Sequence, residues 1–371
     1  NPTNTDYRYN LANYYMALGD MNNEATYDLP NALVNYKKVL KIGEELRAEN
    51  SEDLNTLSIL DNAYERVGNI RFKMGDLKGA LNDYQASLAL NERLLASHPD
   101  KVNMQRGLVI SYSLIGLVFH ADGKYREALE QFAKSRNLLT NSIAADPNNA
   151  DLPRNLAICD DETAKSHIAL GEIDEATKLA NNALAIREKM FAADSTNILI
   201  YGDLTVSLDT VGELRIKAGD AAGGLKLLNR SLEMREAAFK QDPTMILAKH
   251  YIGVSRGKIA KAFRAQNNLN AALEQQQQAL KIYRELNRDD ATNLEIHRQL
   301  AELLKQTGET LTSIGVKERN REKWSEARAL LEESLKIYSE MKANNQFFGA
   351  DEAKITTLND FIGKHEQIFN N

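Results

Sequence analysis

The 371-residue sequence has one cysteine, little proline and no excess of basic residues. The single cysteine, Cys159, excludes an internal disulfide framework and a cysteine-based zinc site. The net charge of -6 argues against a general nucleic-acid binder, which needs a strongly basic surface to displace counterions. We therefore expect the partner to be something other than nucleic acid.

Long apolar runs and strand patterns are also missing. No apolar run reaches the roughly 18 residues that a membrane-spanning helix needs. No segment alternates apolar and polar residues with the period of two that is typical of strands. Apolar residues instead recur at spacings of three and four, and none of the six prolines falls inside a predicted helix. The sequence therefore predicts an all-α chain without a membrane span.

Small residues recur along the chain at a fixed period. Pairs of small or turn-forming residues lie seven positions apart, and from the second pair onward each step is 48 residues: Ala12/Gly19, Gly68/Gly75, Gly116/Gly123, Ala164/Gly171, Gly212/Gly219, Ala260/Asn267 and Gly308/Gly315. A second small residue follows each pair: Ala32, Ala80, Ala128, Ala176, Gly224, Ala272 and Ala327. Such self-similarity is the signature of a repeat architecture.

Each repeat predicts two helices. The Gly or Asn of each pair ends the first helix in a left-handed turn. A proline near the end of several repeats (Pro99, Pro147 and Pro243) ends the second helix, because proline has no N–H to donate. The first and last repeats carry apparent insertions, at 20–28 and 316–323, that are either extra helical turns or loops.

The small residues indicate close helix packing. Gly68 or Ala164 on a first helix, and Ala80 or Ala128 on a second helix, allow two backbones to approach each other. A bulkier side chain there would overpack the contact and cost about 1–3 kcal/mol.

This pattern resembles the tetratricopeptide repeat. The positions that carry the resemblance are Gly68, Gly75, Ala80, Tyr84 and Ser87 in one repeat, and Gly116, Gly123, Ala128, Phe132 and Ser135 in the next. The usual unit has about 34 residues, so a 48-residue unit implies helices that are each longer by about two turns. Long repeats of this kind resemble those in arrays attached to bacterial signalling proteins.

The resemblance implies one α-α superhelix over residues 1–371, made of about seven helical hairpins and a C-terminal capping helix. The expected repeats span 7–50, 54–98, 102–146, 150–194, 198–242, 246–290 and 294–342. We expect the cap within 349–369, with its inward side formed by Ile355, Leu358, Phe361, Ile362, His365 and Ile368.

Residues with catalytic or metal-binding spacing are not found. The six histidines form no i, i+4 pair, and no glycine-rich phosphate loop or Gly-x-Ser-x-Gly elbow is present. We expect Cys159 to be a small core residue and the acidic group 160–162 to be solvated or salt-bridged. The prediction is a non-enzymatic chain without cofactor or metal; a catalytic role would require an unfamiliar all-α active site.

First helices line the concave groove in the tetratricopeptide-repeat family. Carried onto this sequence, the resemblance implies a groove for a protein or peptide lined by Asn69, Phe72, Lys73, Leu117, His120, Asp161, Lys165, Ile168, Glu213, Ile216, Lys261 and Arg264. Its middle is apolar, and exposed apolar surface of that extent usually marks an interaction site.

A row four residues before the groove positions is basic. It contains Arg106, Arg154, His250 and Arg298 in the same register. Arginine suits bidentate binding of carboxylate or phosphate, so this basic ladder could face a ligand. The alternative is that each arginine pairs with an acid of its own chain, such as Asp100 or Asp151.

Two functions agree with these observations. The first is a protein-protein interaction module that holds an extended or helical partner segment in its groove. The alternative is a sensor or scaffold arm of a larger signalling enzyme, such as a bacterial serine/threonine kinase. The start at Asn1 and the tyrosine-rich first helix lead us to expect a piece of a longer protein. The compartment stays open between the cytoplasm and an extracytoplasmic arm of a bacterial protein.

Overall fold

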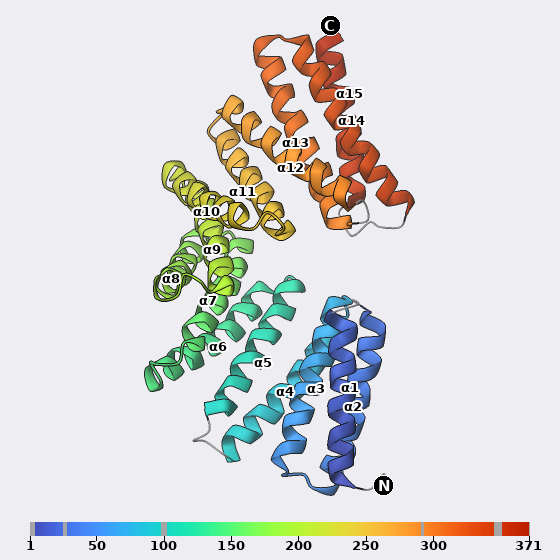
Figure 1. The fold of residues 1–371 in the computed structure, drawn as a ribbon, viewed down its shortest axis with the longest axis vertical. Helices are drawn as coiled ribbons and strands as arrows, with labels where there is room; N and C mark the ends of the chain where they lie inside the picture. Colours follow the sequence, from blue (N-terminus) through green and yellow to red (C-terminus); the bar gives the residue numbers. More distant parts are fainter. Residues whose placement is uncertain (1–3, 25–27, 98–101, 291–292, 345–350, 371) are drawn as a thin grey trace. The chain divides into compact units, whose positions relative to one another are not determined.

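Helical hairpins and a single C-terminal helix make up the described chain. The computed structural model describes residues 4–24, 28–97, 102–290, 293–344 and 351–370, and within these ranges it contains helices and no strand (Figure 1). The first eight helices are α1 (Thr5–Glu24), α2 (Leu29–Glu49), α3 (Leu54–Lys73), α4 (Leu77–Ser97), α5 (Val102–Ala121), α6 (Tyr125–Ala145), α7 (Asp151–Ala169) and α8 (Ile173–Ala193). The others are α9 (Ile198–Lys217), α10 (Ala221–Gln241), α11 (Ile246–Ala265), α12 (Leu269–Asp289), α13 (Leu294–Glu318), α14 (Arg321–Ala343) and α15 (Asp351–Asn370).

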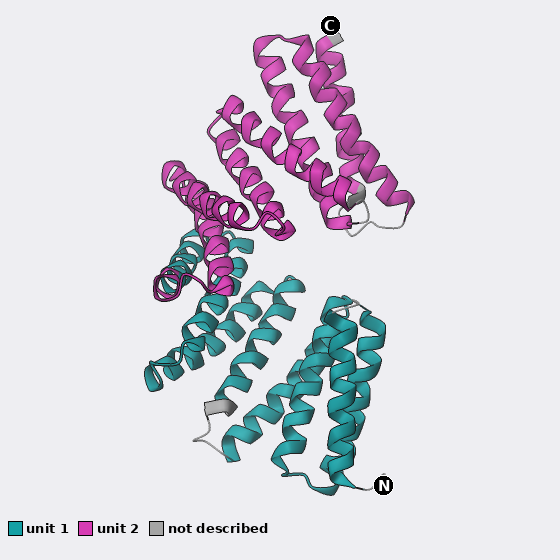
Figure 2. Cartoon of the chain, in the orientation of Figure 1, with its two compact units in different colours: residues 1–187 teal, residues 188–371 magenta. Residues whose placement is uncertain are grey.

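The chain divides into two compact units, residues 1–187 and 188–371, with the boundary inside α8 (Figure 2). Within each unit, the second helix of a hairpin also packs on the first helix of the next one. Examples are α2 on α3 and α4 on α5 in unit 1, and α10 on α11 and α12 on α13 in unit 2. Each unit therefore has the predicted all-α solenoid packing, while a single solenoid over residues 1–371 stays a prediction.

Asp and Asn side chains fix the start of several helices. Asp53 Oδ2 accepts the backbone N–H of Thr56 at 2.7 Å at the start of α3, and Asn293 caps α13 in the same way. Such caps satisfy backbone donors that have no partner inside the helix.

Small residues lie at the contact between the two helices of a hairpin, as predicted. A Cβ on Gly68 would lie 2.5 Å from Tyr84 Cε1, and a Cβ on Gly116 would lie 2.6 Å from Phe132 Cε1. The aromatic rings occupy the space that a side chain on these glycines would need. This close approach holds α3 to α4 and α5 to α6.

The predicted turns are confirmed in the middle repeats. The backbone is left-handed at Gly75, Gly123, Gly171, Gly219 and Asn267. Pro147 and Pro243 directly follow the C-caps of α6 and α10, whereas Pro99 lies outside the described residues.

The expected insertion in the first repeat is wrong. Helix α1 has the same length as α3 and lies 49 residues before it, so the repeat contains one extra residue rather than eight. Gly19 is inside α1 and faces Tyr36, as Gly68 faces Tyr84, and so Gly19 rather than Ala12 is the contact glycine. The register was misassigned because Ala12 and Gly19 are both small and lie two helical turns apart. Residues 25–27 of the expected insertion lie outside the described residues.

The insertion in the last repeat is present and is helical. Helix α13 has 25 residues and α14 has 23, compared with 20 and 21 in α9 and α10. Gly315 therefore lies inside α13 and not at the turn, and Arg319 takes the left-handed conformation with φ 53°. Added turns extend the hairpin without rotating its buried stripe.

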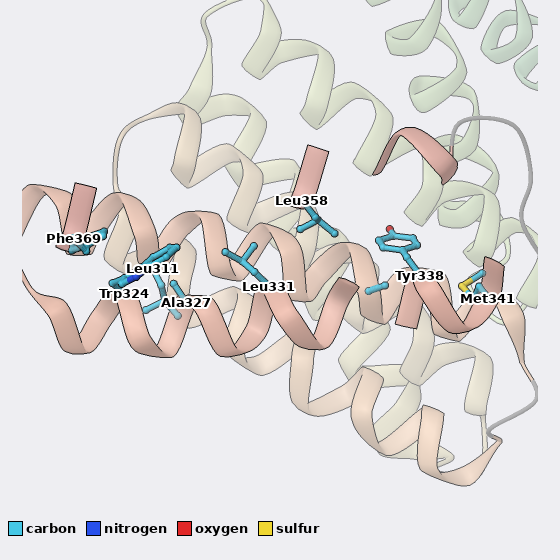
Figure 3. Close-up of a cluster of buried hydrophobic side chains, with 9 residues drawn as sticks. Leu311, Trp324, Ala327, Leu331, Tyr338, Met341, Leu358 and Phe369 are labelled. Carbon is cyan, nitrogen blue, oxygen red and sulfur yellow. The ribbon is translucent and has the colours of Figure 1, made fainter. Parts of the chain in front are cut away.

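Helix α15 covers this extended last hairpin, as expected for the cap (Figure 3). Leu358 is buried in the same cluster as Leu331, and Phe369 stacks on Trp324 with ring centroids 5.2 Å apart. Ile368 was expected to face inward but is 49% exposed, because Phe369 occupies the inward position beside it. Residues 349 and 350 lie outside the described residues.

Candidate partner-binding site

The polar groove residues join neighbouring first helices. Four of them contact the first helix of the adjacent repeat: Lys73 Nζ to Asn23 Oδ1 at 2.8 Å, His120 Nδ1 to Ser166 Oγ at 2.9 Å, Glu213 Oε2 to Lys258 Nζ at 2.9 Å, and Arg264 to Glu309 Oε2 at 3.1 Å. These four residues therefore lie at contacts between neighbouring first helices, and the shared groove face stays a prediction. The polar groups of these four side chains therefore connect neighbouring repeats.

Other predicted groove residues bond within their own repeat. Asn69 Oδ1 accepts the Tyr84 hydroxyl at 2.7 Å, and Lys165 pairs with Glu162 at 2.6 Å. Asp161 pairs with Arg187 at 2.5 Å, and burial nevertheless raises the pKa of Asp161 above its ordinary value. These side chains position the hairpins and leave few free polar groups on the face.

Two of the predicted apolar groove residues, Phe72 and Ile216, pack against the cores of their hairpins. Phe72 packs on the cluster around Tyr84 and Ile115. A Cβ on Gly224 would lie 2.5 Å from Ile216 Cγ1, so Ile216 fills the space beside that glycine. Ile168 is half-buried on α7, and Lys261 is exposed on α11.

Unit 1 contains an apolar pocket between α5, α6 and α7. Its volume is about 330 Å³. Ile110, Leu114, Leu117 and Ile158 form its walls, and the buried residues Phe132, Leu139 and Cys159 line it. Its charged lining residues are Arg106 on α5 and Asp151 and Glu162 on α7. The pocket therefore combines an apolar interior with both charge signs.

The pocket exists because three equivalent positions of the repeat are filled differently. In this part of unit 1 they are Ser113, Leu139 and Cys159. In unit 2, 96 residues later, they are Asp209, Arg235 and Ser255. Ser113, Leu139 and Cys159 are uncharged and short, so they leave a hollow at the place where unit 2 has a buried ion pair.

The ion pair of unit 2 is almost completely buried. Arg235 is 4% exposed and Asp209 is 2% exposed. An Arg235 guanidinium nitrogen donates to Asp209 Oδ2 at 2.8 Å and also to the Ser255 hydroxyl. The Arg235 guanidinium lies over the Tyr251 ring, 5.3 Å from its centroid. Together these contacts fill the space that is open in unit 1.

A second, more polar pocket lies in unit 2 between α11, α12 and α13. Its volume is about 210 Å³, and the same three positions are Gly257, Tyr283 and Leu303. A Cβ on Gly257 would meet nothing within 4 Å, so the glycine leaves the hollow open. The lining side chains Lys258, Lys261, Glu213 and Glu302 give this pocket both charge signs.

The four residues of the basic ladder, Arg106, Arg154, His250 and Arg298, have different surroundings. Arg106 is exposed and lines the unit 1 pocket together with Asp151. Arg154 and Arg298 have partners in the chain, whereas Asp100 lies outside the described residues. Burial lowers the pKa of His250, and the nearby Arg235 lowers it further. His250 therefore adds no positive charge to the row at neutral pH.

Cys159 is a buried core residue and Asp160 is salt-bridged, as predicted. Cys159 is buried, and burial raises its pKa to about 11. Asp160 is fully buried and pairs with Arg136 at 2.6 Å. Among the described residues, no group of three or more His, Cys, Asp or Glu side chains could hold a metal ion. None of the helices in the described ranges is long and apolar enough to span a bilayer.

The interior of the unit 1 pocket was not predicted from the sequence. Leu139 and Cys159 have the pattern of ordinary core residues. The available signal was a comparison across repeats, because Arg187 and Arg235 stand where Leu139 and Tyr283 stand in the neighbouring repeats. Such a change of residue type at one repeat position indicates that the space between the helices is open in one repeat and filled in another.

The fold and this face define an α-helical repeat protein. The family model described as tetratricopeptide repeat matches residues 62–100 and 254–290. These two segments of the chain therefore match the tetratricopeptide repeat that the sequence pattern resembles. No protein of curated function matches this sequence.

Solved structures of repeat proteins have a similar fold. BtubC (BKLC) from P. vanneervenii has 15% sequence identity and a TM-score of 0.55, covering 70% of this chain and 92% of its own. The apo form of RapI has 15% identity and a TM-score of 0.56, covering 87% of this chain and 99% of its own. At this identity the similarity concerns the fold alone.

Proposed function

We propose that this chain is a non-catalytic interaction module that binds an extended or helical segment of a partner protein on its first helices. The observation that carries the proposal is the apolar pocket of unit 1. Its lining includes Leu117, one of the predicted groove residues, and the 38% exposed Ile158.

The pocket suits one bulky apolar side chain of the bound segment. Concave apolar sites with a few charged groups are the usual form of a ligand pocket. Arg106 and Glu162, on opposite helices of the pocket, are placed to bind polar groups that flank this anchor. The anchor would supply most of the affinity, and the charged groups would orient the segment.

The proposal is tested with peptides selected on the protein itself. A random peptide library is panned on the wild-type chain, and the enriched peptides are measured by fluorescence anisotropy. We expect Ile158→Glu to weaken their binding at least tenfold, because a carboxylate would face the apolar wall.

Val206→Glu is the matched control. Val206 stands at the equivalent position of α9, 48 residues after Ile158, and is 48% exposed, but the residues 48 positions after Ser113 and Leu139 are Asp161 and Arg187, which form an ion pair. This variant should bind the selected peptides like the wild type. Equal weakening by both variants, or by neither, would reject the pocket as the binding site.

A further inference from the structure

Helix α1 carries an apolar stripe on its outer face. The stripe consists of Tyr7, Leu11, Tyr14, Leu18 and Met21, which are spaced alternately four and three residues apart. This spacing is typical of a helix that pairs with another helix. Tyr7, Tyr14 and Met21 are each more than half exposed, and Leu11 and Leu18 are half-buried.

The same face is buried on the next first helix. The equivalent residues of α3 are Thr56, Leu60, Ala63, Val67 and Ile70, and none of them is more than 2% exposed. Helix α2 covers this face: a Cβ on Gly43 of α2 would lie 2.7 Å from Leu60 Cδ2, and Tyr36 clusters with Val67 and Ile70. On α3 these residues therefore form the surface on which the preceding second helix, α2, packs.

Other first helices repeat this arrangement. In α11 the equivalent residues Ile252, Ser255, Ile259 and Ala262 are buried, and in α13 Ile296, Leu300, Leu303, Thr307 and Thr310 are buried. The preceding second helices, α10 and α12, pack against α11 and α13. Among the described residues, no helix covers the stripe of α1. The stripe of α1 therefore continues an interface that already exists inside each unit.

The charge around the stripe indicates what could cover it. Asp6 and Glu24 are exposed near its two ends, and Asp20 is half-buried. The basic residue of α1, Arg8, is buried and pairs with Glu49 of α2 at 2.6 Å. The exposed charge of α1 is therefore acidic. A second copy of α1 would bring like charges together, whereas a basic helix would complement them.

We propose that the apolar stripe of α1 binds an amphipathic helix of a partner protein with basic residues beside its apolar stripe. The bound helix takes the position on α1 that α2 takes on α3. The stripe spans 14 residue steps, or about 21 Å at 1.5 Å per residue, so it accommodates four turns of the partner helix. This site is separate from the pocket on the first-helix groove face.

The probes are two synthetic peptides derived from residues 29–49, the α2 segment that covers the equivalent face of α3. The basic peptide carries Glu44→Lys, Glu45→Lys and Glu49→Lys, and the acidic peptide carries Lys37→Glu, Lys38→Glu and Lys41→Glu. Both keep the apolar residues of α2. We expect the basic peptide to bind the full chain at least tenfold more tightly than the acidic peptide, measured by fluorescence anisotropy.

Two variants of the chain locate the binding. Tyr14→Asp places a charge in the middle of the stripe and should weaken binding of the basic peptide at least tenfold. Val34→Asp, on the exposed side of α2, introduces the same charge outside the stripe and should leave the affinity unchanged. Both replaced side chains are more than half exposed, so both variants should keep the urea midpoint of the wild type.

Several results would overturn the proposal. One is the absence of binding by the basic peptide at millimolar concentration, and another is binding that is insensitive to Tyr14→Asp. A third is a dimer of the wild-type chain in analytical ultracentrifugation that Tyr14→Asp dissociates, because a second copy would then cover the stripe.

Discussion

One repeat of unit 1 and one repeat of unit 2 fill the same three positions in different ways. In unit 1, Ser113, Leu139 and Cys159 leave an apolar hollow of about 330 Å³. In unit 2, Asp209 and Arg235 fill the equivalent space with a buried ion pair. The surrounding helices have the same order and nearly the same lengths in both places. The backbone framework therefore permits either solution.

This difference agrees with the small net contribution that buried ion pairs make to stability. Replacing a buried ion pair by apolar residues is often neutral for stability, whereas removing one partner alone is costly. A repeat can therefore exchange an ion pair for an open pocket only if several positions change together. The interior of a repeat can vary in this way while the fold is kept.

Breaking the ion pair should have the largest effect. Asp209→Ala leaves the buried Arg235 without its carboxylate partner, and we expect a loss of about 3–5 kcal/mol of unfolding free energy. Urea unfolding measures this change. Glu188→Ala removes the exposed pair with Arg230 and should cost less than about 1 kcal/mol. Similar losses for both variants would contradict the difference in burial.

Placing half of the ion pair into unit 1 should also destabilise the chain. Leu139→Arg puts a guanidinium at a position that is 2% exposed, and we expect a loss of about 2–3 kcal/mol. Adding Ser113→Asp supplies the carboxylate that Asp209 provides in unit 2 and should recover at least half of the loss. A double-mutant cycle in urea measures this coupling. Additive effects would show that the two places are not equivalent.

Replacing two glycines of the unit 2 pocket by alanine should change the unfolding free energy in opposite directions. A Cβ on Gly253 would lie 2.8 Å from Tyr283 Cε2, so Gly253→Ala should cost about 1–3 kcal/mol. Gly257→Ala adds a methyl group in open space within α11 and should stabilise the chain by about 0.5–1 kcal/mol. Thermal unfolding of both variants tests the prediction, and destabilisation by Gly257→Ala would mean that the hollow is not open.

The smallest expected effect concerns two aspartates of unit 1. Burial raises the pKa of Asp61, although Ser87 and Asn91 donate hydrogen bonds to its carboxylate. Its contribution to stability is therefore present below the unfolded-state pKa of about 3.9 and is lost as pH rises through the higher folded-state pKa. Asp61→Asn should be more stable than the wild type at pH 7, by no more than about 1 kcal/mol, with no difference below pH 3.

Asp53 is the control with the opposite sign. Its hydrogen bond from Tyr9 lowers its pKa, and the backbone N–H of Thr56 lowers it further. Its contribution is present above the unfolded-state pKa and is lost as pH falls through the lower folded-state pKa. Asp53→Asn should therefore be less stable than the wild type at pH 7. Urea midpoints between pH 3 and pH 7 compare the two variants, and equal signs would contradict the assignment.

The repeat fold was readable in the sequence because Gly68, Gly116 and their equivalents must be small wherever an aromatic ring packs against the neighbouring helix. The register of the first repeat was not readable, since both Ala12 and Gly19 satisfy that requirement. The extension of the last hairpin was detected by its length and its cap was predicted, but only the structure shows that the added residues extend the two helices.

The groove face remains a prediction from the sequence. The first-helix positions predict which residues share that face. They could not show that Lys73, His120 and Arg264 bind neighbouring repeats, because these contacts depend on side-chain reach between helices. The pocket interior was missed for a related reason. Leu139 has the character of a core residue. Its role in lining the pocket becomes visible only when it is compared with Arg235 at the equivalent position.

The affinity of a library-selected peptide for the Ser113→Asp/Leu139→Arg chain tests the binding role of the unit 1 pocket most directly. The double variant fills the hollow with the residues that unit 2 carries, and the unfolding curve verifies that the chain is folded. We expect the affinity to fall at least tenfold relative to the wild type. An unchanged affinity in a folded double variant would show that the pocket does not hold the partner.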